Sequence, residues 1–504
     1  SVPTSTSVEP PPTFLFRYAN VPAVMIHCPL CHLAASPIMC CIKREEASRR
    51  GTACTLTMAE PERIRALNDR KATKGAFVLY WMQASQRARF NHALEYAIGM
   101  ANDRHLPVVV LFTLTDNYPE ANLRHYSFML QGLHETFMSL RDRGISPVVL
   151  RGEPNTVVPR FARKAAAVIT DCGYTRHQKA WRTDIAQGLE CPCIQVETDA
   201  IVPVESASNK EEYAAYTLRP KINRSLLRYM IAPQENEPVA TGFQPDVESI
   251  DLSDWMGILQ TLPLDRSVEP VDLPGGTSHA RERITAFVEN QLDDYHKKRS
   301  DPNAGVYSGM SPYLHFGQIS PLDVALTADD HGGPGADSFL EELIIRRELA
   351  INFVHFNPQY DAYESLPVWS RETLSEHAVD PRAYIYELRE LEGAATHDDY
   401  WNAAQHEMMR TGTMHNYMRM YWGKKILEWS KNPFEAFQTV LYLNNKWELD
   451  GRDPNSYAGV AWCFGKHDRP WKERPVFGKV RYMSASGLER KFDMGAYVAR
   501  NEER

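Results

Sequence analysis

The sequence predicts a protein of two parts, an α/β half with a parallel sheet followed by a mostly helical half. Three observations predict this arrangement. Short apolar runs alternate with amphipathic stretches from about residue 75 to 205. A stretch rich in Pro, Glu, Asp, Ser and Gly follows over 206–275, and helical periodicity then dominates to about residue 500. The chain of 504 residues is long enough for two domains.

Buried strands explain the apolar runs of the first half. The run 106–114 is almost wholly apolar, which is typical of a parallel strand covered by helices on both faces. Such a Rossmann-like sheet binds ligands at the carboxyl ends of its strands. No glycine-rich phosphate motif follows any strand, so phosphate binding is not expected in this half. Strands are expected at 75–82, 106–114, 145–150, 167–171 and 193–197, and helices at 87–104, 122–143, 155–166 and 176–189.

The turn-forming composition of 206–275 predicts a long connection, with one ordered helix over 213–230. In the second half, Ser320 before Pro321 favours a capped helix start, and Pro433 fits a first helical turn. Neither a repeat nor a heptad pattern is present. Helices are expected at 279–298, 320–330, 336–356, 382–391, 398–410, 413–430 and 433–446.

Residues 1–57 differ from the rest, because they mix Pro, Ser and Cys without periodicity and hold five of the nine cysteines. We hypothesise that the natural start lies at or near Met58 and that the upstream stretch is an extension; a targeting peptide is the alternative. Cys28 and Cys31 have the spacing of zinc ligands, but no second such pair follows, so we predict no metal site. The other four cysteines form no disulfide framework, which favours a reducing, intracellular compartment.

The net charge of −8 gives no global sign of nucleic-acid binding, and no apolar run approaches the roughly 20 residues that span a bilayer. A local basic patch is nevertheless enough to contact phosphates. Residues 465–481 hold six basic and two acidic side chains, with Trp471 and Phe477 between them. Cations beside aromatic faces suit an opened or single-stranded nucleic acid, and a solvated basic loop is the alternative.

Half of the ten tryptophans lie between residues 396 and 462. Two of them, Trp422 and Trp429, lie two helical turns apart, roughly 10 Å along one face. This pattern fits a wall around an aromatic ligand, a path for electrons, or a large core. Arg419 lies within one turn of Trp422, and Asp450, in the loop after the next helix, could pair with it.

Two further segments carry candidate chemistry. Residues 307–321 are small and polar and precede a helix, so their N–H groups, with Ser308 and Ser311, could hold a pyrophosphate; a capped loop is the alternative. Glu342 and Arg346 lie four residues apart and therefore share a face of the predicted helix. They form either a solvated salt bridge or a site whose carboxyl, with a raised pKa, donates a proton or hydrogen bond.

Taken together, these segments resemble the photolyase/cryptochrome superfamily, and specifically the class II cyclobutane pyrimidine dimer (CPD) photolyases. The resemblance runs from about residue 62 to 500, with several long motifs in the family's order. The matching segments are 78–87, 120–130, 212–221, SPYLHFGQIS at 311–320, THDDYWNAAQ at 396–405, 411–429 and LDGRDPNSYAGVAW at 449–462.

The resemblance implies an α/β antenna domain over 62–205, able to hold a chromophore such as a deazaflavin, a linker over 206–275, and an all-α FAD-binding domain over 276–500. It implies repair of UV-damaged DNA, with an electron passing from excited reduced FAD to a flipped-out dimer. A cryptochrome-like blue-light receptor is the alternative, and the class II motifs weigh against a (6-4) photolyase. We expect a monomer without membrane association, located where the DNA resides, which is the nucleus in a eukaryote.

The resemblance also assigns residues. Those implied near the flavin and its phosphates are Tyr295, Ser308, Met310, Ser311, Gln318 and Asn416, with an Arg419–Asp450 salt bridge beside the ring. Asn444 matches the asparagine near flavin N5, and Asn455 is the second choice. The implied electron path runs through Trp422, Trp401 and Trp429.

On the substrate side, Glu342 matches the glutamate that hydrogen-bonds the dimer, and Met420 and Trp462 match residues contacting the flipped bases. Arg299 and Arg481 match arginines that face DNA, the latter filling the gap left in the duplex. One departure is Arg346, which stands where some class II relatives have a second substrate tryptophan.

Overall fold

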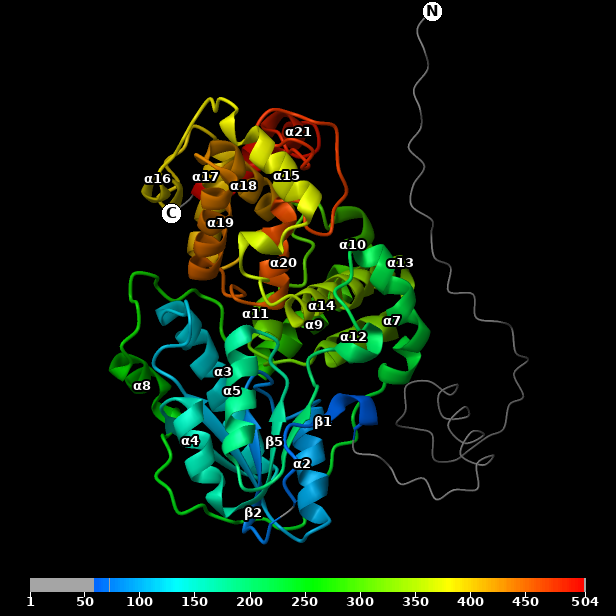
Figure 1. Ribbon diagram of the computed structural model, residues 1–504, viewed down its shortest axis with the longest axis vertical. Coiled ribbons are helices and arrows are strands. Elements are labelled where there is room, and N and C mark those ends of the chain that lie inside the picture. Colours follow the sequence, from blue (N-terminus) through cyan, green and yellow to red (C-terminus); the bar gives the residue numbers. More distant parts are fainter. Residues whose placement is uncertain (1–58, 72, 503–504) are drawn as a thin grey trace, which may run out of the picture. The chain divides into compact units, whose positions relative to one another are not determined.

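A six-stranded sheet forms the core of the N-terminal half in the computed structural model, which describes residues 59–71 and 73–502 (Figure 1). The hypothesised start at Met58, the alternative targeting peptide and the Cys28–Cys31 pair lie outside the described residues. The strand order is β1-β6-β5-β2-β3-β4, and the pairings among β2 to β6 are parallel. The strands are β1 (Ile64–Ala66), β2 (Phe77–Met82), β3 (Val108–Leu114), β4 (Ser146–Arg151), β5 (Ala165–Asp171) and β6 (Cys193–Val196).

Helices cover both faces of this sheet, as the apolar strands predict. Alternate residues of β3 point to opposite sides, so Val108 and Val110 pack with α2 (His92–Asn102) and α3 (Leu123–Asp142). Val109 and Leu111 pack with the opposite layer, α4 (Pro154–Phe161) and α5 (Arg176–Gly188). The predicted parallel α/β architecture is therefore confirmed.

Two local predictions in this half are wrong. Strand β1, which pairs antiparallel with β6 at the sheet edge, was not expected, because three residues are too few to show an alternating pattern. The helix predicted from residue 87 begins only at His92, because the Asn91 side chain accepts a hydrogen bond from Leu94 N and caps the helix there.

The connection between the halves contains more helix than its composition suggests. The expected helix over 213–230 is present as α7 (Ala215–Tyr229), whereas α6 (Val204–Ala207) and α8 (Trp255–Thr261) were not expected. The described residues all belong to one compact unit, so the boundaries drawn at 62–205, 206–275 and 276–500 stay predictions.

The second half is built of helices, as expected, although several differ in extent. The predicted helix 279–298 is broken at Gln291 into two, and only residues from Leu388 onward are helical in the predicted segment 382–391. The helices are α9 (Thr277–Asn290), α10 (Leu292–Lys298), α11 (Ser311–His315), α12 (Pro321–His331), α13 (Gly333–Leu340), α14 (Arg347–Phe356), α15 (Val368–Glu376), α16 (Leu388–Glu392), α17 (Asp399–Thr411), α18 (Asn416–Trp429), α19 (Pro433–Trp447), α20 (Pro454–Cys463), α21 (Ala485–Glu489) and α22 (Met494–Glu502).

A π-helical turn, Glu341–Arg346, joins α13 to α14 without interrupting the helical path. The sequence predicts one regular helix over 336–356. Since a π turn holds more residues than an α turn, it rotates the side chains that follow it relative to those that precede it.

Buried polar contacts join helix α3 to the helical half. Arg124, which is 3% exposed, donates hydrogen bonds to the main-chain oxygens of Met408, Met409 and Trp447. On the same helix, Gly132 lies so close to the Gln318 side chain that a Cβ atom would come within 2.2 Å of it. These contacts hold the sheet and the helices in one arrangement, which positions residues from both halves around a common cavity.

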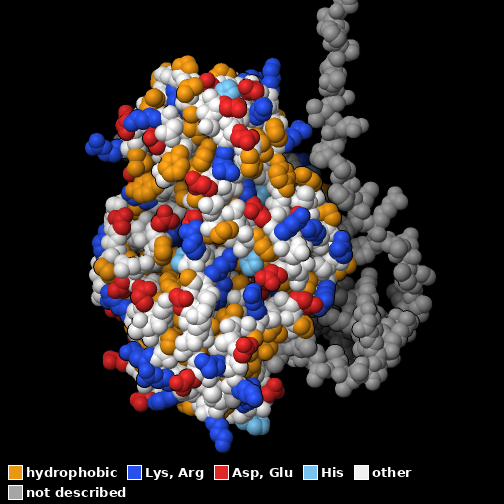
Figure 2. All heavy atoms as spheres, viewed as in Figure 1, with side chains coloured by type: hydrophobic (Ala, Val, Ile, Leu, Met, Phe, Trp, Pro, Cys, Tyr) orange, Lys and Arg blue, Asp and Glu red, His pale blue; other side chains and the backbone are white. Residues whose placement is uncertain are grey.

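None of the helices in the described part of the chain combines the length and apolar character needed to cross a bilayer. Basic and acidic side chains intermix over the face of the molecule seen in Figure 2.

Candidate active site

Helices α17 and α18 bring three tryptophans into contact. The rings of Trp422 and Trp401 are nearly parallel, with centroids 6.2 Å apart, and the rings of Trp401 and Trp429 lie 5.7 Å apart at 67°. Trp401 Nε1 donates a hydrogen bond to Trp422 O, and Trp422 Nε1 donates one to Gln405 Oε1. Trp401 therefore bridges two indoles that α18 alone holds two turns apart, in the spatial order 422, 401, 429.

Further aromatic contacts lead from Trp429 toward solvent. Trp429 itself is only 2% exposed. Its ring meets the edges of Tyr386 at 5.4 Å and His397 at 5.3 Å, and Tyr384 stacks on His397 at 3.6 Å. Because Tyr384 is exposed, the line of rings continues to the surface.

Arg419, one turn before Trp422 on α18, binds two carboxylates. Its Nη2 lies 3.2 Å from Asp450 Oδ1 and 2.9 Å from Glu448 Oε2. The Asp450 contact is the one expected from sequence, whereas Glu448 was missed, since nothing in its local pattern marks it. Burial raises the pKa of Glu448 well above its usual range; Arg419 opposes this rise and Asp450 adds to it. Arg419 Nε is buried without a hydrogen-bond partner among the described residues.

Glu342 pairs with Arg299 rather than with Arg346. Glu342 Oε1 lies 2.8 Å from Arg299 Nη1, at the end of α10, whereas Arg346 Nε lies 3.5 Å from Glu341. Of the two alternatives drawn from the sequence, the Glu342–Arg346 salt bridge is therefore not formed, because each side chain pairs with another residue. Both members of the Glu342–Arg299 pair are partly exposed, at 29% and 37% of the side chain, so a ligand can reach them.

Tyr295 and His415 surround this pair. Arg299 lies over the Tyr295 ring at 6.0 Å, and burial raises the pKa of Tyr295 to about 12, with the charge of Glu342 adding to the rise. His415 caps α18; burial lowers its pKa to about 4, against the opposing effect of a hydrogen bond to the main chain of Arg299. Through His415 the Glu342–Arg299 pair lies beside the start of the helix that carries Arg419.

Two cations contact the ring of Trp462. Lys424 Nζ lies 5.0 Å from the ring centroid and donates a hydrogen bond to Cys463 O, while Arg481 lies 5.3 Å from the same ring. Arg481 also pairs with Asp468 at 2.9 Å and lies 4.2 Å from the Trp471 ring. The basic segment 465–481 thus places Arg481 beside Trp462, and its partner Asp468 holds it there.

Lys424 was missed from sequence and is fully buried beneath Trp462. Burial lowers its pKa to about 8. Met420 lies half-buried on the same helix, and its main-chain oxygen contacts Cys463 Sγ. Lys424, Met420 and Trp462 therefore form a neighbouring set on α18 and α20.

The two candidate asparagines differ in environment. Asn444 is 2% exposed, and its Nδ2 donates to Asn445 Oδ1 and Ser456 Oγ. Asn455 is exposed in the first turn of α20. This burial favours Asn444 over Asn455 for a contact with an enclosed ring.

Of the other candidates for flavin binding, Ser308 and Ser311 are half-buried at the start of α11, Asn416 is exposed at the start of α18, and Met310 is buried in the core. Gln318 is different. Its Oε1 accepts from Gly276 N at 2.7 Å and its Nε2 donates to Phe128 O at 3.1 Å, with the side chain fully buried. The expected cofactor contact of Gln318 is therefore replaced by a link between main-chain segments of the two halves.

These side chains fit a flavin dinucleotide. Arg419 Nε is a buried donor without an acceptor among the described residues, and Asn444 supplies a buried amide side chain. Half-buried hydroxyls at Ser308 and Ser311 suit phosphate oxygens. No group of three or more potential metal ligands occurs within the described ranges.

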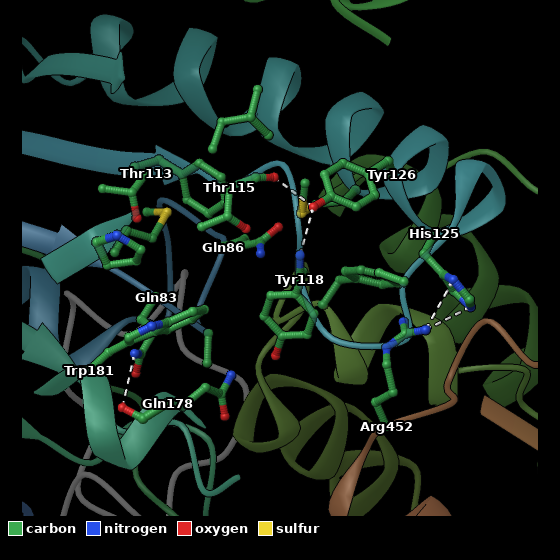
Figure 3. A pocket seen from close by; sticks show the side chains of 18 of the residues that line it. Gln83, Gln86, Thr113, Thr115, Tyr118, His125, Tyr126, Gln178, Trp181 and Arg452 are labelled. Atoms are coloured by element: carbon green, nitrogen blue, oxygen red, sulfur yellow. Dashed lines mark hydrogen bonds between the residues drawn. The ribbon is translucent and has the colours of Figure 1, made fainter. Parts of the chain in front are cut away.

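A cavity lies at the carboxyl ends of β2 and β3 (Figure 3). Its position is the one that a parallel sheet predicts for a ligand. Aromatic side chains from the sheet half form much of its wall, and residues from the helical half close it. The main contributors are Trp81, Phe112, Tyr118, Tyr126, Trp181, Gln83, Gln86, Gln178, His125, His315, Phe316 and Arg452.

Comparison with known proteins gives one consistent answer. A DNA photolyase family model matches residues 78–240. The chain is 50% identical over 447 residues to the deoxyribodipyrimidine photo-lyase of Methanothermobacter thermautotrophicus, covering 88% of this chain and 98% of that protein. It is 39% identical to the protein of the same name from Arabidopsis thaliana, covering 84% and 88% of the two chains.

Solved structures show the same fold. An archaeal photolyase from Sulfolobus tokodaii superimposes with a TM-score of 0.66 at 17% identity, covering 84% of this chain and 90% of that chain. A bacterial class III photolyase from Agrobacterium tumefaciens gives a TM-score of 0.64 at 18% identity, covering 85% and 87%. The identity to the Methanothermobacter protein, over nearly its whole length, shows that this chain belongs to the DNA photolyase family.

Proposed function

We propose that this chain repairs cyclobutane pyrimidine dimers in UV-damaged DNA under light. The observation that carries the proposal is 50% identity to a deoxyribodipyrimidine photo-lyase over 98% of that relative's length. The retained motifs favour class II. When bound in the helical half, FAD would supply the photochemical electron donation that opens the dimer, and residues of this chain would hold and orient both groups.

The flavin would be held by residues of the helical half. We assign Arg419 and Asp450 to the edge of the ring system and Asn444 to its centre. Glu448, within 2.9 Å of Arg419, then positions that guanidinium rather than touching the flavin. Tyr295, Ser308, Met310, Ser311 and Asn416 are assigned to the remainder of the flavin and its phosphates.

The dimer would be bound between the Glu342–Arg299 pair and Trp462 with Met420. An ionised carboxylate only accepts hydrogen bonds, so it cannot by itself stabilise negative charge arriving on the pyrimidine carbonyls. Arg299, 2.8 Å away, supplies the missing donors while Glu342 holds it in place and accepts from base N–H groups. Flipping is less costly for a lesion that pairs and stacks poorly, which favours damaged sites.

Trp422, Trp401 and Trp429 would return resting, oxidised flavin to the reduced form under light. Their rings are buried and in contact, which suits stepwise electron transfer from the surface. Repair itself does not need this path once the flavin is reduced. The two roles are therefore separable by experiment.

The deciding experiment follows repair of a thymine-dimer oligonucleotide by the flavin-reduced protein. We expect absorbance near the thymine band to recover in blue light and not in darkness. Glu342→Gln should lower the yield, whereas the control Glu341→Gln, on the same π turn but paired with Arg219, should not. Flavin binding and photoreduction without any recovery would support a blue-light receptor instead, and a protein that binds no flavin would contradict both.

The cavity at the carboxyl ends of β2 and β3 is proposed to hold a light-harvesting chromophore, such as a deazaflavin. Its aromatic wall suits a planar ring system. The Sulfolobus tokodaii photolyase was solved with two FAD molecules, with the implication of a novel light-harvesting cofactor, so a second flavin is the alternative. Absorption spectra of the chromophores extracted from native protein distinguish the two. We further propose a monomer that acts wherever the cell keeps its DNA.

A further inference from the structure

The basic segment of the helical half contains a short hairpin over residues 471–479. Arg474 and Gly478 exchange main-chain hydrogen bonds at 2.9 and 2.8 Å, and Trp471 N donates to Lys479 O at 2.8 Å. Cations beside an exposed aromatic ring suit contacts with phosphates and bases. The position of the hairpin therefore bears on the DNA binding proposed above. Its exposed basic and aromatic side chains are Trp471, Lys472, Arg474 and Lys479.

Neutral contacts bind the returning strand of the hairpin to α15 (Figure 1). The Phe477 side chain is buried, at 2% exposure. Lys479 N donates a hydrogen bond to Thr373 Oγ1, on α15, at 3.1 Å. Gly478 lies so close to this helix that a Cβ atom there would come within 2.1 Å of Thr373 Oγ1 and 2.8 Å of His377 Cδ2. None of these contacts involves the outgoing strand, which is held in a different way.

A histidine between two carboxylates binds the outgoing strand. His377 directly follows α15, with Nδ1 2.6 Å from Asp380 Oδ2 and Nε2 3.2 Å from Glu473 Oε1 on the hairpin. Asp380 Oδ2 also accepts a hydrogen bond from Val476 N at 2.8 Å. Since ionised carboxylates only accept hydrogen bonds, both ring nitrogens must donate, and only the imidazolium does so. The hydrogen bond to Asp380 raises the pKa of His377, against the opposing effect of burial, and the bond to Glu473 adds to the rise.

Glu473 is the one acidic residue of the hairpin 471–479. Two further cations lie near the cluster. Lys479 Nζ lies 4.0 Å from Glu473 Oε2 but is half exposed, so this contact contributes little, and Arg382 donates to the main-chain oxygen of Asp380 at 3.0 Å. Among the described residues, His377 is thus the only cation outside the hairpin within ion-pair distance of Glu473. Its positive charge neutralises a carboxylate that would otherwise repel phosphates.

We propose that His377 is a positioning residue for DNA binding, and that its bridge to Glu473 makes the DNA affinity of the hairpin depend on the protonation of this histidine. The inference rests on the proposed function, which supplies DNA as the partner. Without the proton, Asp380 and Glu473 face a neutral ring that donates only one hydrogen bond. The outgoing strand then loses its contact with the turn after α15, and Glu473 places an uncompensated negative charge beside the phosphates. By linkage, the proton and DNA each strengthen the binding of the other.

The test measures the dissociation constant of a thymine-dimer duplex by fluorescence anisotropy, at constant salt and from about pH 6 to about pH 9, which brackets a histidine with a raised pKa. Lys424 also loses its proton in this range, so the quantity compared is the difference between variants. We expect the affinity of the unaltered chain to fall by about fivefold more across the range than that of His377→Gln. His377→Arg keeps its charge throughout and should retain tight binding at both ends.

Two further variants assign the effect to the bridge. His279→Gln removes a histidine that lies 3.6 Å from Glu282 on α9, outside the cluster, and should leave the pH dependence of the unaltered chain intact. Glu473→Gln should remove the same part of the pH dependence as His377→Gln, and the double variant should remove no more. Because Glu473 is exposed, its variant decides the question even if His377→Gln fails to fold.

An identical pH dependence in the unaltered chain, His377→Gln and Glu473→Gln would overturn the inference. So would an equal loss of affinity at every pH in both His377→Gln and His377→Arg, because that result marks a merely structural role. Neither outcome would touch the proposed function, since the repair assay can be run at saturating protein. An unaltered chain that repairs no dimer in light and binds damaged and undamaged duplexes equally would overturn the proposed function instead.

Discussion

Glu448 and Asp450 are expected to substitute for each other as the counter-charge of Arg419. Both lie within 3.2 Å of the same guanidinium nitrogen, and the Glu448 side chain is fully buried. Two ionised carboxylates on one cation would leave a net buried negative charge. Because burial, with Asp450 adding, raises the pKa of Glu448 well above its usual range, we expect Glu448 to take up the proton that relieves this excess charge.

Single substitutions should therefore cost little. Glu448→Gln replaces a neutral acid by a neutral amide and should change the free energy of unfolding by about 1 kcal/mol or less. Asp450→Asn removes one of the two carboxylates, but Glu448 then loses a like-charged neighbour and takes over as the counter-charge of Arg419, so we expect a cost of about 1–2 kcal/mol. The double variant leaves Arg419 with no carboxylate and should cost about 3–5 kcal/mol, the usual penalty for an uncompensated buried charge.

The assay is urea unfolding of the four proteins at pH 7, followed by circular dichroism, with flavin content measured in parallel. The expected coupling energy is about 1–3 kcal/mol, within the range seen for residues in contact. Additive single and double variants would refute the shared role. A cost of about 3–5 kcal/mol for Asp450→Asn alone would show that Glu448 cannot take over.

Three further predictions follow from buried groups. Trp401→Phe removes indole contacts of 6.2 and 5.7 Å and leaves a gap of about 10 Å between Trp422 and Trp429 along α18. Flavin photoreduction under blue light should therefore slow, while repair by pre-reduced protein persists. An unchanged photoreduction rate would refute the path, and Trp447→Phe serves as the control. Glu348 accepts hydrogen bonds from Ile201 N and Val202 N, and burial raises its pKa from 4.5 to about 8. The folded state therefore binds a proton more readily than the unfolded chain. As pH rises across this window, the free energy of unfolding should fall by up to about 5 kcal/mol. Glu348→Gln should flatten that loss in unfolding measured at pH 5 and 9, and an unchanged slope would contradict the assignment. Burial lowers the pKa of Lys424 from 10.5 to about 8, so the unfolded chain binds the extra proton and the free energy of unfolding should rise with pH between these values. Lys424→Met should remove this rise in urea midpoints taken at pH 7.5 and 10. The same rise in both proteins would rule out Lys424 as its cause.

Much of the α/β half could be predicted from sequence, because its strands are continuous apolar runs and its helices are amphipathic. Short elements such as β1 and α11 were not predicted, since they contain too few residues to show a hydrophobic period. The Arg419–Asp450 pair could also be anticipated from its motif. Glu448, two residues before Asp450, could not, because its burial depends on helices that pack around it.

The substrate-side prediction shows where spacing fails. Glu342 and Arg346 lie four residues apart, yet Glu342 pairs with Arg299 from another helix and Arg346 lies near Glu341, which spacing along one helix does not reveal. Gln318 shows the same limit for a polar side chain. Nothing in its neighbourhood in the sequence signals that Gly276 and Phe128, from distant segments, use both of its polar atoms.

The sequence by itself determined the α/β and helical halves, the family, and the residues that carry its motifs, because periodicity and motif spacing depend on neighbours a few residues away. Tertiary structure alone decided which charged groups meet. Packing of separate elements brings Arg299 to Glu342 and places Trp401 between Trp422 and Trp429. It also places Arg452 in the cavity wall. The pKa values and unpaired charges that give these sites their chemistry depend on burial and on such distant partners, and local sequence contains neither.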